Sequence, residues 1–539
     1  MLCNRATNTF LAGKAGAEMG SIINKIKLFN FKRFRDYIII PNEKMNILVG
    51  DNEVGKSTVL EAIDLVACGN AKRIEAIGLD KLINVDSVKA FNAGERTFEK
   101  LPILRVELYL TGNFDYTVNG KNNTDARKCD GIRLVCEPNR DYISEITEAL
   151  EAHESYFPYD YYTVRFSTFA DEPYTGYKKK IRSVMIDSSK METEHATNDF
   201  VRRMYWQYTE EDIKERAFHK SKYRQMRTGF SVDSLGDLNN RVPRQKNYMF
   251  GLKNGSSMDM EGDLMIYENE VGIDSKGTGK QVFIKTDFAL EHSGNKVDVI
   301  LIEEPENHLS PVNLRKLVQR VADAKEGQLF ITTHSSIIST RLEVRNLLVM
   351  HESGERTPIM LHNLSEDTAK YFMKTPPASI VEYALSNRVL MVEGPAEYML
   401  LEKFYVSCVG RTPEMDGVNI IDVRGLSFKR YLEIAQQTGS RVAVLTDNDK
   451  DYQKHCVDKY IEYASDVNIE IFYDKDNSKR TFEIVLYFDN QTLCDGLFGN
   501  NALKYMLNNK TEAAYSLLAQ NSPITVPDYM KRAIDWIRK

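Results

Sequence analysis

The sequence predicts an α/β protein in which a P-loop domain, interrupted by a helical insertion, precedes a smaller domain with a parallel sheet. Three observations support this fold class: a phosphate-binding loop near the start, a strand that ends in acids near the middle, and short apolar strands that alternate with helices in the last third. Such alternation is typical of parallel sheets. A length of 539 residues with 42% hydrophobic residues is sufficient for roughly two to four domains with their own cores.

The phosphate-binding loop has the sequence GDNEVGKST and starts at Gly50. The apolar run Met45–Val49 is expected to form the strand before it, and the apolar spacing after it predicts a helix. In such a loop, glycines let backbone N–H groups face the phosphates, the lysine adds a positive charge and the serine ligates Mg²⁺. The sequence therefore predicts a nucleoside triphosphate site formed by Gly50, Asn52, Gly55, Lys56, Ser57 and Thr58.

The acidic residues that complete this nucleotide site are expected directly after the strand Val297–Ile302. Open α/β sheets bind ligands at the carboxyl ends of their buried strands. We expect Glu303 to hold Mg²⁺ with its waters, and Glu304 to orient or deprotonate the water that attacks the γ-phosphate. The next predicted strand, Leu329–Thr333, leads into His334, which is expected to contact the γ-phosphate.

The last third of the chain contains three further predicted strands, Val389–Val392, Val418–Val423 and Val442–Thr446. Acids follow the first and third of these strands, at Glu393, Glu397, Asp447 and Asp449. Clustered carboxylates repel one another, and their hard oxygen atoms suit Mg²⁺ or Mn²⁺, which polarise a phosphodiester and activate water. The sequence therefore predicts a divalent-metal site at the carboxyl edge of a second parallel sheet.

The P-loop domain resembles the ABC-like ATPase heads of the structural-maintenance and RecF type. The resemblance rests on the Glu-Glu-Pro-Glu end of the acid strand, on His308-Leu309-Ser310 after it, and on the Thr-Thr-His-Ser strand end. In such heads, a signature loop of one subunit closes over the ATP held by the other, which implies a homodimer or higher oligomer. The resemblance assigns this loop to residues 275–281, with Ser275 and Gly277, although their sequence departs from the usual Leu-Ser-Gly-Gly. The alternative is a surface turn rich in glycine and lysine.

The second domain resembles a TOPRIM domain, in which a glutamate after the first strand and an Asp-x-Asp after the third hold the metal. An ABC-like head followed by a TOPRIM domain is similar to the OLD (overcoming lysogenization defect) family of ATP-dependent nucleases, which includes the nuclease subunit of Gabija-type phage defence. The resemblance covers roughly residues 22–520. It implies that Glu483 contributes to the metal site and that Lys510 stabilises charge on the scissile phosphate. The alternative for Lys510 is a solvated helix lysine.

We expect the following domain organisation. Residues 1–21 are a leader, residues 22–139 and 261–370 form the ABC-like head, and residues 140–260 form a helical insertion or dimerisation arm. A linker at 371–387, which contains Thr375-Pro376-Pro377, precedes the Rossmann-like TOPRIM domain with its C-terminal helices at 388–539.

Charge and composition limit the partners. A net charge of −6 argues against indiscriminate binding of polyanions, so a DNA-binding surface must be local. Seven cysteines without metal-like spacing indicate a reducing compartment, and no apolar run approaches the ~20 residues that span a membrane, so a cytoplasmic protein is expected. Two basic patches are candidates for DNA contact, and a solvated face with core aromatic residues is the alternative: Lys25, Lys27, Lys32, Arg33 and Arg35 with Phe29, Phe31 and Phe34, and Lys178, Lys179, Lys180 and Arg182.

The expected function is an ATP-regulated, Mg²⁺- or Mn²⁺-dependent DNA endonuclease or nickase, with anti-phage defence as the setting that the resemblance implies. Family members act alone, beside a helicase, or with a retron reverse transcriptase and its RNA and DNA. Two alternatives are an ATP-driven clamp that binds DNA without cutting it, and a topoisomerase or primase with the same TOPRIM chemistry. The complete set of acids argues against the clamp, because binding alone does not need a metal cluster. The sequence contains no recognisable strand-passage module, which argues against the topoisomerase.

Overall fold

The computed structural model shows two compact units. One consists of the described residues of Met1–Asn46 and Gly55–Thr333, and the other of Ile47–Val54 and the described residues of His334–Lys539. The predicted leader and the Thr375-Pro376-Pro377 segment of the predicted linker lie outside the described residues. The described residues are 22–112, 114–152, 156–175, 179–187, 194–209, 212–241, 249–250, 252, 260–291, 298–323, 327–351, 357–374, 380–425, 427–520 and 522–539.

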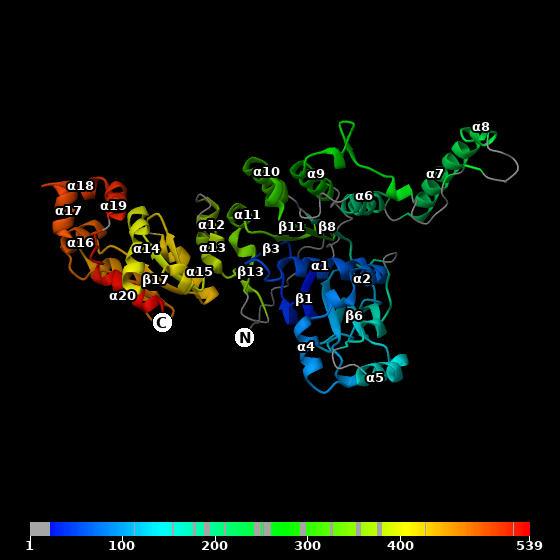
Figure 1. Ribbon diagram of the computed structural model, residues 1–539, viewed down its shortest axis with the longest axis horizontal. Helices are drawn as coiled ribbons and strands as arrows, with labels where there is room; N and C mark the ends of the chain where they lie inside the picture. The colour runs from blue at the N-terminus through cyan, green and yellow to red at the C-terminus, as the bar shows by residue number, and fades with distance from the viewer. Residues whose placement is uncertain are drawn as a thin grey trace, which may run out of the picture. The chain divides into compact units, whose positions relative to one another are not determined.

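An antiparallel sheet begins the first unit, with strand order β2-β1-β4-β6-β5 and with β7 also paired to β6. Figure 1 labels β1 and β6 of this sheet. Along β1, Ile26 and Leu28 are fully buried and lie opposite Leu108 and Val106 of β4. This period of two is required of a sheet that places one face on the core. The strands are β1 (Ile22–Phe31), β2 (Phe34–Ile39), β4 (Leu104–Thr111), β5 (Asn119–Gly120), β6 (Cys129–Pro138) and β7 (Tyr162–Thr168).

A second sheet contains the strands predicted around the nucleotide site, in the order β14-β13-β3-β12-β11-β8. β11 pairs in parallel with β12 and β8, β13 pairs in parallel with β3, and β14 is antiparallel to β13. Every residue of β11 and β12 is buried, as expected for parallel strands covered on both faces. The three strands predicted for this domain are confirmed as β3, β11 and β12. The strands are β3 (Met45–Gly50), β8 (Ser183–Asp187), β11 (Val299–Glu303), β12 (Gln328–Thr332), β13 (Leu347–Met350) and β14 (Ile359–Met360).

The segment 140–260, for which the sequence predicts helices, also supplies two strands, β7 and β8. Val184 and Ile186 of β8 are buried, and Val184 lies opposite Ile300 of β11. This short apolar run therefore extends the second sheet by one strand. The helices described in this unit are α1 (Lys56–Cys68), α2 (Ala71–Ile77), α3 (Leu79–Leu82), α4 (Val85–Ala93), α5 (Ile143–Ala152), α6 (Glu194–Tyr208), α7 (Ile213–Asp233), α8 (Gly236–Asn239), α9 (Thr278–Glu291) and α10 (Pro311–Ala322).

A buried carboxylate joins the P-loop helix to its neighbours. Asp64 of α1 is fully buried, and its oxygens lie 2.6 Å from Nη1 of Arg73 on α2 and 2.7 Å from Nη1 of Arg203 on α6. The hydroxyl of Ser183 on β8 donates a further hydrogen bond of 3.2 Å. Burial alone would raise the pKa of Asp64, but the two arginines hold it well below its usual value. Asp64 is therefore charged and connects four elements.

The second unit contains a parallel four-stranded sheet in the order β16-β15-β17-β18. Leu390 and Val392 of β15 share a hydrophobic core with α14 and α20, while α15 also contacts β17. The three strands predicted for this domain are confirmed as β15, β16 and β17. The strands are β15 (Arg388–Val392), β16 (Val418–Asp422), β17 (Arg441–Leu445) and β18 (Ile469–Phe472).

The helices described in the second unit follow the alternation that the sequence predicts. Among the residues that the structure describes, no helix is long and apolar enough to cross a membrane. The helices are α11 (Ser336–Arg341), α12 (Glu366–Lys374), α13 (Ile380–Leu385), α14 (Pro395–Val409), α15 (Phe428–Thr438), α16 (Phe482–Asp489), α17 (Gln491–Phe498), α18 (Ala502–Asn508), α19 (Lys510–Leu518) and α20 (Asp528–Ile537).

Candidate functional site

The P-loop connects β3 to α1 along a path that requires both of its glycines. Gly55 has a φ of 99°, in the left-handed region that favours glycine, and a Cβ there would lie 2.6 Å from Cζ of Phe34. A Cβ on Gly50 would lie 2.7 Å from the carbonyl oxygen of Met350. A side chain at either position would therefore displace the loop.

The residues after Gly55 present the start of α1 to a ligand. Lys56, the first residue of the helix, is 5% exposed, whereas Asn52 and Ser57 are exposed and Thr58 is half-buried. The first N–H groups of a helix lack partners within the helix, and the helix dipole favours an anion at this end. The loop thus has the features of a phosphate site.

The two acids after β11 differ in environment. Glu303 is 8% exposed, while Glu304 adopts a left-handed conformation with φ 41° and ψ 56°. The backbone N–H of Glu304 donates to the carbonyl oxygen of Thr332 at 3.0 Å, and its carboxylate accepts a hydrogen bond from the side chain of Asn307 at 2.7 Å. Such a conformation is costly for a residue other than glycine and persists only where its surroundings fix it. His334, which follows β12, is exposed.

The predicted signature loop forms the turn into α9. Ser275 and Gly277 are both exposed and precede the first residue of the helix. A Cβ on Gly279 would lie 2.1 Å from the carbonyl oxygen of His308, so α9 packs directly on the segment that follows the acids. The exposed loop is therefore anchored next to the acid strand.

The second candidate site lies where the strand order of the parallel sheet reverses. β15 is flanked by β16 and β17, and the chain passes from β15 through α14 to β16 and then through α15 to β17. In doubly wound sheets, loops at such a reversal diverge and leave a crevice at the carboxyl ends of the strands. Glu393 directly follows β15, and Asp447 follows β17 after one residue. The topology therefore places both acids at this crevice.

Hydrogen bonds fix the two acids relative to each other. The hydroxyl of Thr446 and the backbone N–H of Asp447 both donate to Oε1 of Glu393, at 2.6 and 3.0 Å. The N–H of Phe482, at the start of α16, donates to Oδ1 of Asp447 at 2.8 Å. Because Glu483 is the next residue, this bond also connects Asp447 to the predicted acid of α16.

The acids of this group raise one another's pKa values. Burial raises the pKa of Glu397 to about 7, and the charges of Glu483 and Glu393 contribute to the increase. Burial, followed by the charges of Glu393 and Glu397, raises the pKa of Asp447 well above its usual range. Burial also raises the pKa of Glu393, against the hydrogen bonds that it accepts. A cation bound among these acids would relieve the repulsion.

Glu483 and Lys510 form an ion pair beside the acids. Nζ of Lys510 lies 2.8 Å from Oε1 of Glu483, which is 3% exposed. The other oxygen of Glu483 is buried and has no hydrogen-bond partner among the described residues. Burial alone would lower the pKa of Lys510, but Glu483, with the charges of Asp447 and Glu397, raises it. Lys510 therefore keeps its positive charge.

The structure brings together five of the six residues predicted for the nuclease site and places Asp449 at their exposed edge. Asp449 has a φ of 47°, and its N–H donates to the carbonyl oxygen of Arg480 at 3.3 Å. Within the described residues, no three acidic, histidine or cysteine side chains already surround one point as metal ligands. The donors are nevertheless hard oxygens, one of them buried without a partner, and this set fits Mg²⁺ or Mn²⁺.

Sequence reasoning missed Asn448, which lies between the two aspartates. Its side chain is 1% exposed, and its amide N–H groups donate to the carbonyl oxygens of Asp474, Asp476 and Lys479 at 2.9, 2.9 and 3.3 Å. These bonds hold the loop that leads into α16 and Glu483. A polar residue at the end of a buried strand was the available signal, but the pattern does not reveal its partners.

The two basic patches that are candidates for DNA contact differ in their surroundings. In the first patch, Lys25 and Lys27 form ion pairs with Asp125. Phe31 and Phe34 are buried, so these aromatic residues belong to the core and are not free to stack on bases. In the second patch, Lys178 lies outside the described residues. Its neighbour Lys179 lies over the ring of Trp206 on α6, with Nζ 5.7 Å from the ring centre.

Comparisons with protein families match both units. The TOPRIM domain family of overcoming lysogenization defect-like proteins matches residues 385–449, a span that contains Glu393, Glu397, Asp447 and Asp449 but not Glu483 or Lys510. An AAA ATPase domain family matches residues 22–246, which include the P-loop. A second AAA domain family, described for AbiEii-type toxins of type IV toxin–antitoxin systems, matches residues 157–339. A search of curated proteins found no match.

Several solved structures are similar at low identity. The Smc head bound to the C-winged helix domain of ScpA is 16% identical, with 65% of this chain and 99% of that chain covered and a TM-score of 0.32. A RecF–ATP structure is 12% identical, with 60% and 94% covered and a TM-score of 0.33. The C-terminal region of the Xanthomonas campestris pv. campestris OLD protein is 18% identical, with 28% and 95% covered and a TM-score of 0.21. Because these TM-scores are low, the conclusions rest on the family matches and the geometry.

The fold and the two sites define the class of protein, an ATPase joined to a nuclease domain. Within this class, the chain combines AAA-type ATPase domains with an OLD-like TOPRIM domain, as the resemblance in the sequence implies.

Proposed function

We propose that this protein is an ATP-regulated nuclease that cuts or nicks DNA with Mg²⁺ or Mn²⁺. The observation that carries the proposal is the group of acids at the carboxyl ends of β15 and β17, next to the ion pair of Lys510 with Glu483. Acids that raise one another's pKa values suit a bound cation, and the lysine beside them suits an anionic substrate.

In the nuclease site, the proposed metal ligands are all carboxylates. A bound Mg²⁺ or Mn²⁺ would polarise the phosphodiester and activate water. Thr446 orients the carboxylate of Glu393, and Phe482 orients that of Asp447. Lys510 neutralises negative charge on the scissile phosphate. The ligands are Glu393, Glu397, Asp447, Asp449 and Glu483.

In the ATPase head, the P-loop would hold the phosphates, and Ser57 would ligate Mg²⁺ together with Glu303. Glu304 positions the attacking water, and His334 contacts the γ-phosphate. Ser275 and Gly277 of a second copy close the site, so the active form is a homodimer or higher oligomer. The exposed position of both signature-loop residues supports this assignment.

The proposed organisation is a head at 22–139 and 261–370, an inserted arm at 140–260, a linker at 371–387 and a TOPRIM domain at 388–539. The proposed setting is anti-phage defence in the cytoplasm. A helicase, or a retron reverse transcriptase with its RNA and DNA, is the class of partner to be sought by co-purification from the native host.

Cleavage assays with the Asp447→Ala variant test this function. Purified protein is incubated with plasmid, linear and single-stranded DNA, with Mg²⁺ or Mn²⁺ and with or without ATP, and Glu414→Ala, at an exposed acid, is the matched control. We expect Asp447→Ala to lower cleavage by on the order of 10²-fold or more, since metal electrostatics are lost. DNA affinity and ATP binding should change little, because phosphate contacts by basic residues do not depend on Asp447.

Two outcomes contradict the proposal in different ways. If Asp447→Ala cuts DNA at the wild-type rate, the cleavage site lies elsewhere. If the wild type binds ATP and DNA but never cuts under any of these conditions, the protein is an ATP-driven clamp.

A further inference from the structure

Helix α7 is unusual among the long helices of the first unit because none of its 21 residues is buried. It contains six lysine or arginine residues and only two acids, in a chain whose net charge is −6. A helix of this length measures about 30 Å. α7 therefore concentrates positive charge on an extended surface that does not contribute to a core.

The basic residues of α7 fall into two groups. Arg216, Lys220 and Arg227 are half-buried, and Lys220 forms an ion pair with Glu261 at 2.8 Å. Lys214, Lys222 and Arg224 are exposed. Lys220 and Arg216, which lies over the ring of Trp206, therefore hold α7 to neighbouring segments, and the second group is exposed to a partner.

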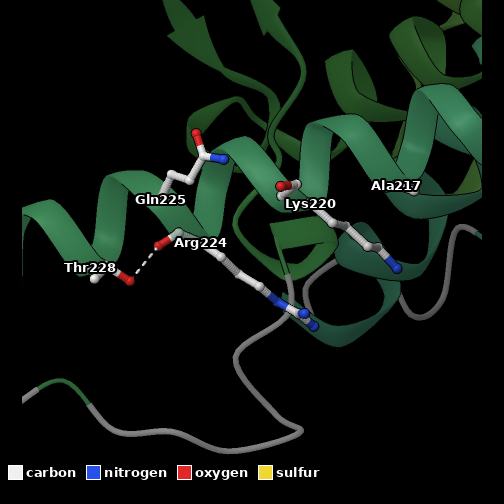
Figure 2. A pocket seen from close by; sticks show the side chains of 6 residues that line it. Ala217, Lys220, Arg224, Gln225 and Thr228 are labelled. Atoms are coloured by element: carbon white, nitrogen blue, oxygen red, sulfur yellow. Dashed lines mark hydrogen bonds between the residues drawn. The ribbon is translucent and has the colours of Figure 1, made fainter.

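A groove along α7 is lined by polar and basic side chains. Figure 2 shows Lys220 and Arg224 extending to the same side of the helix, while Gln225 points to a different side. The hydroxyl of Thr228 is held by the carbonyl oxygen of Arg224 at 3.0 Å. The groove is lined by Ala217, Lys220, Ser221, Arg224, Gln225 and Thr228. The Thr228 hydroxyl thus already has an acceptor, whereas amide and guanidinium groups such as those of Gln225 and Arg224 are typical donors to phosphate oxygens.

The positive surface continues beyond α7 through Trp206 of α6. The guanidinium of Arg216 lies 5.5 Å from the centre of the Trp206 ring, and Nζ of Lys179 lies 5.7 Å from it. Lys179 of the second basic patch is thus linked to the start of α7 by one aromatic side chain, whereas Lys180 and Arg182 of that patch form ion pairs with Asp115 and Asp298.

The spacing of the exposed charges suits a nucleic-acid backbone. Lys214 and Arg224 are ten residues apart, which is about 15 Å along the helix axis, or about four phosphate spacings of one strand. These two residues lie about 80° apart around the axis and so share one side of α7, whereas Lys222, two residues before Arg224, lies on the opposite side from Arg224. A protein–protein interface usually has few lysines at its core, so the charge favours nucleic acid over protein as the partner. We propose that α7, together with Lys179, binds the phosphate backbone of DNA. This inference rests on the proposed nuclease function.

The test is a triple variant, Lys214→Gln, Lys222→Gln and Arg224→Gln, in the full-length protein. Lys72→Gln, Lys81→Gln and Lys89→Gln, at three exposed lysines of the same unit, form the matched control with the same change of charge. Affinities for labelled duplex and single-stranded DNA are measured in EDTA over a series of salt concentrations, so that cleavage does not contribute. Circular dichroism and ATP binding verify the fold of both proteins.

The loss of two to three phosphate contacts corresponds to a reduction of about 1.5 to 3 in the slope of log affinity against log salt, and to roughly 10- to 100-fold weaker binding near physiological salt. We expect the α7 variant to show this change and the control variant to retain nearly the wild-type slope. An unchanged slope in the α7 variant overturns the inference, as does an equal loss in both variants.

Exposed apolar residues on α7 allow a second test, which asks whether the helix is a self-association surface. Phe218 and Met226 are 59% and 63% exposed, and a Phe218→Ala, Met226→Ala variant is expected to leave the oligomer mass unchanged in light scattering. If it lowers the mass while the triple variant binds DNA normally, α7 is a self-association surface and the inference fails. If DNA binding depends on α7 but the protein never cuts DNA, the nuclease proposal fails and the inference about α7 stands.

Discussion

The two carboxylate oxygens of Glu483 have different surroundings, and one of them is paired with Lys510. One of its oxygens lies 2.8 Å from Nζ of Lys510, and the other is buried without a hydrogen bond among the described residues. Glu483 lies in the first turn of α16, and Lys510 is the first residue of α19. An ion pair thus joins two helices, and it leaves one carboxylate oxygen of Glu483 without a hydrogen bond among the described residues.

Replacement of Lys510 tests its proposed role on the substrate. Lys510→Ala should lower the cleavage rate by on the order of 10²-fold, because a charge that stabilises the transition state is lost, while DNA affinity should fall much less. Lys510→Arg keeps the charge and should retain more activity. Lys504→Ala, at an exposed lysine of α18, is the control. A Lys510→Ala protein that cuts as fast as the wild type would leave Lys510 with a structural role alone.

Asn448 is expected to act by positioning the loop before α16. Asn448→Ala removes four hydrogen bonds, three to backbone carbonyl oxygens and one that Oδ1 accepts from the N–H of Lys450, and Asn448→Asp places a carboxylate against the same three carbonyl oxygens. Both variants should require roughly 10- to 100-fold more Mg²⁺ or Mn²⁺ for half-maximal cleavage, the range found for residues that orient metal ligands. Metal titrations of the cleavage rate provide the measurement.

The control for this prediction is Lys475→Ala, at an exposed residue of the same loop. If the Asn448 variants lose activity but keep the wild-type metal requirement, the loop does not position the metal ligands.

Two substitutions in the head separate nucleotide binding from hydrolysis. Lys56→Ala should weaken ATP binding, because the charge at the start of α1 is lost, whereas Glu304→Gln should keep binding and stop hydrolysis. Equilibrium binding of a fluorescent ATP analogue and phosphate release measure the two steps. Wild-type turnover in both variants would exclude the proposed ATPase site.

Asp64 provides a stability prediction with a defined pH dependence. Asp64→Asn leaves Arg73 and Arg203 without their shared carboxylate and should lower the free energy of unfolding by about 3 kcal/mol at pH 7. The folded-state pKa of Asp64 is lowered, so its contribution is fully present above the unfolded value of about 3.9 and is lost as the pH falls through the folded value. The difference between variant and wild type should therefore shrink below about pH 4.

Urea denaturation at several pH values measures this effect, with Asp86→Asn, which affects an exposed ion pair with Lys89, as the control. A difference between wild type and Asp64→Asn that stays constant from pH 7 to acidic pH would show that the charge of Asp64 does not stabilise the fold.

Local patterns allowed most of the strands near the two sites to be predicted. The P-loop strand, the acid strand and the three strands of the TOPRIM sheet were recognisable because a buried parallel strand is a short, continuous apolar run. β8 was missed, since its run of five residues lies in a segment of mixed composition and its partner β11 is distant in the sequence. Glu483 and Lys510 came from a family resemblance, and only the structure pairs them.

Asn448 shows why the remainder of the site was not predictable. Its three acceptors are backbone carbonyl groups, which every residue has, so no sequence pattern identifies them. The charges on α7 were visible, but which of them are half-buried depends on the packing of residues 260–263, which the sequence alone does not reveal.

The pairing of β3 with β13 has a consequence for biosynthesis. Ile47 lies opposite Leu347, so the ribosome must add 300 residues after the P-loop strand before this partner exists. At about 5 to 20 residues synthesised per second, the edge of β3 that pairs with β13 stays unpaired for roughly 15 to 60 seconds. Contacts so distant in the chain also slow folding itself. Low expression temperature and co-produced chaperones should therefore raise the yield of native protein more than stronger promoters do.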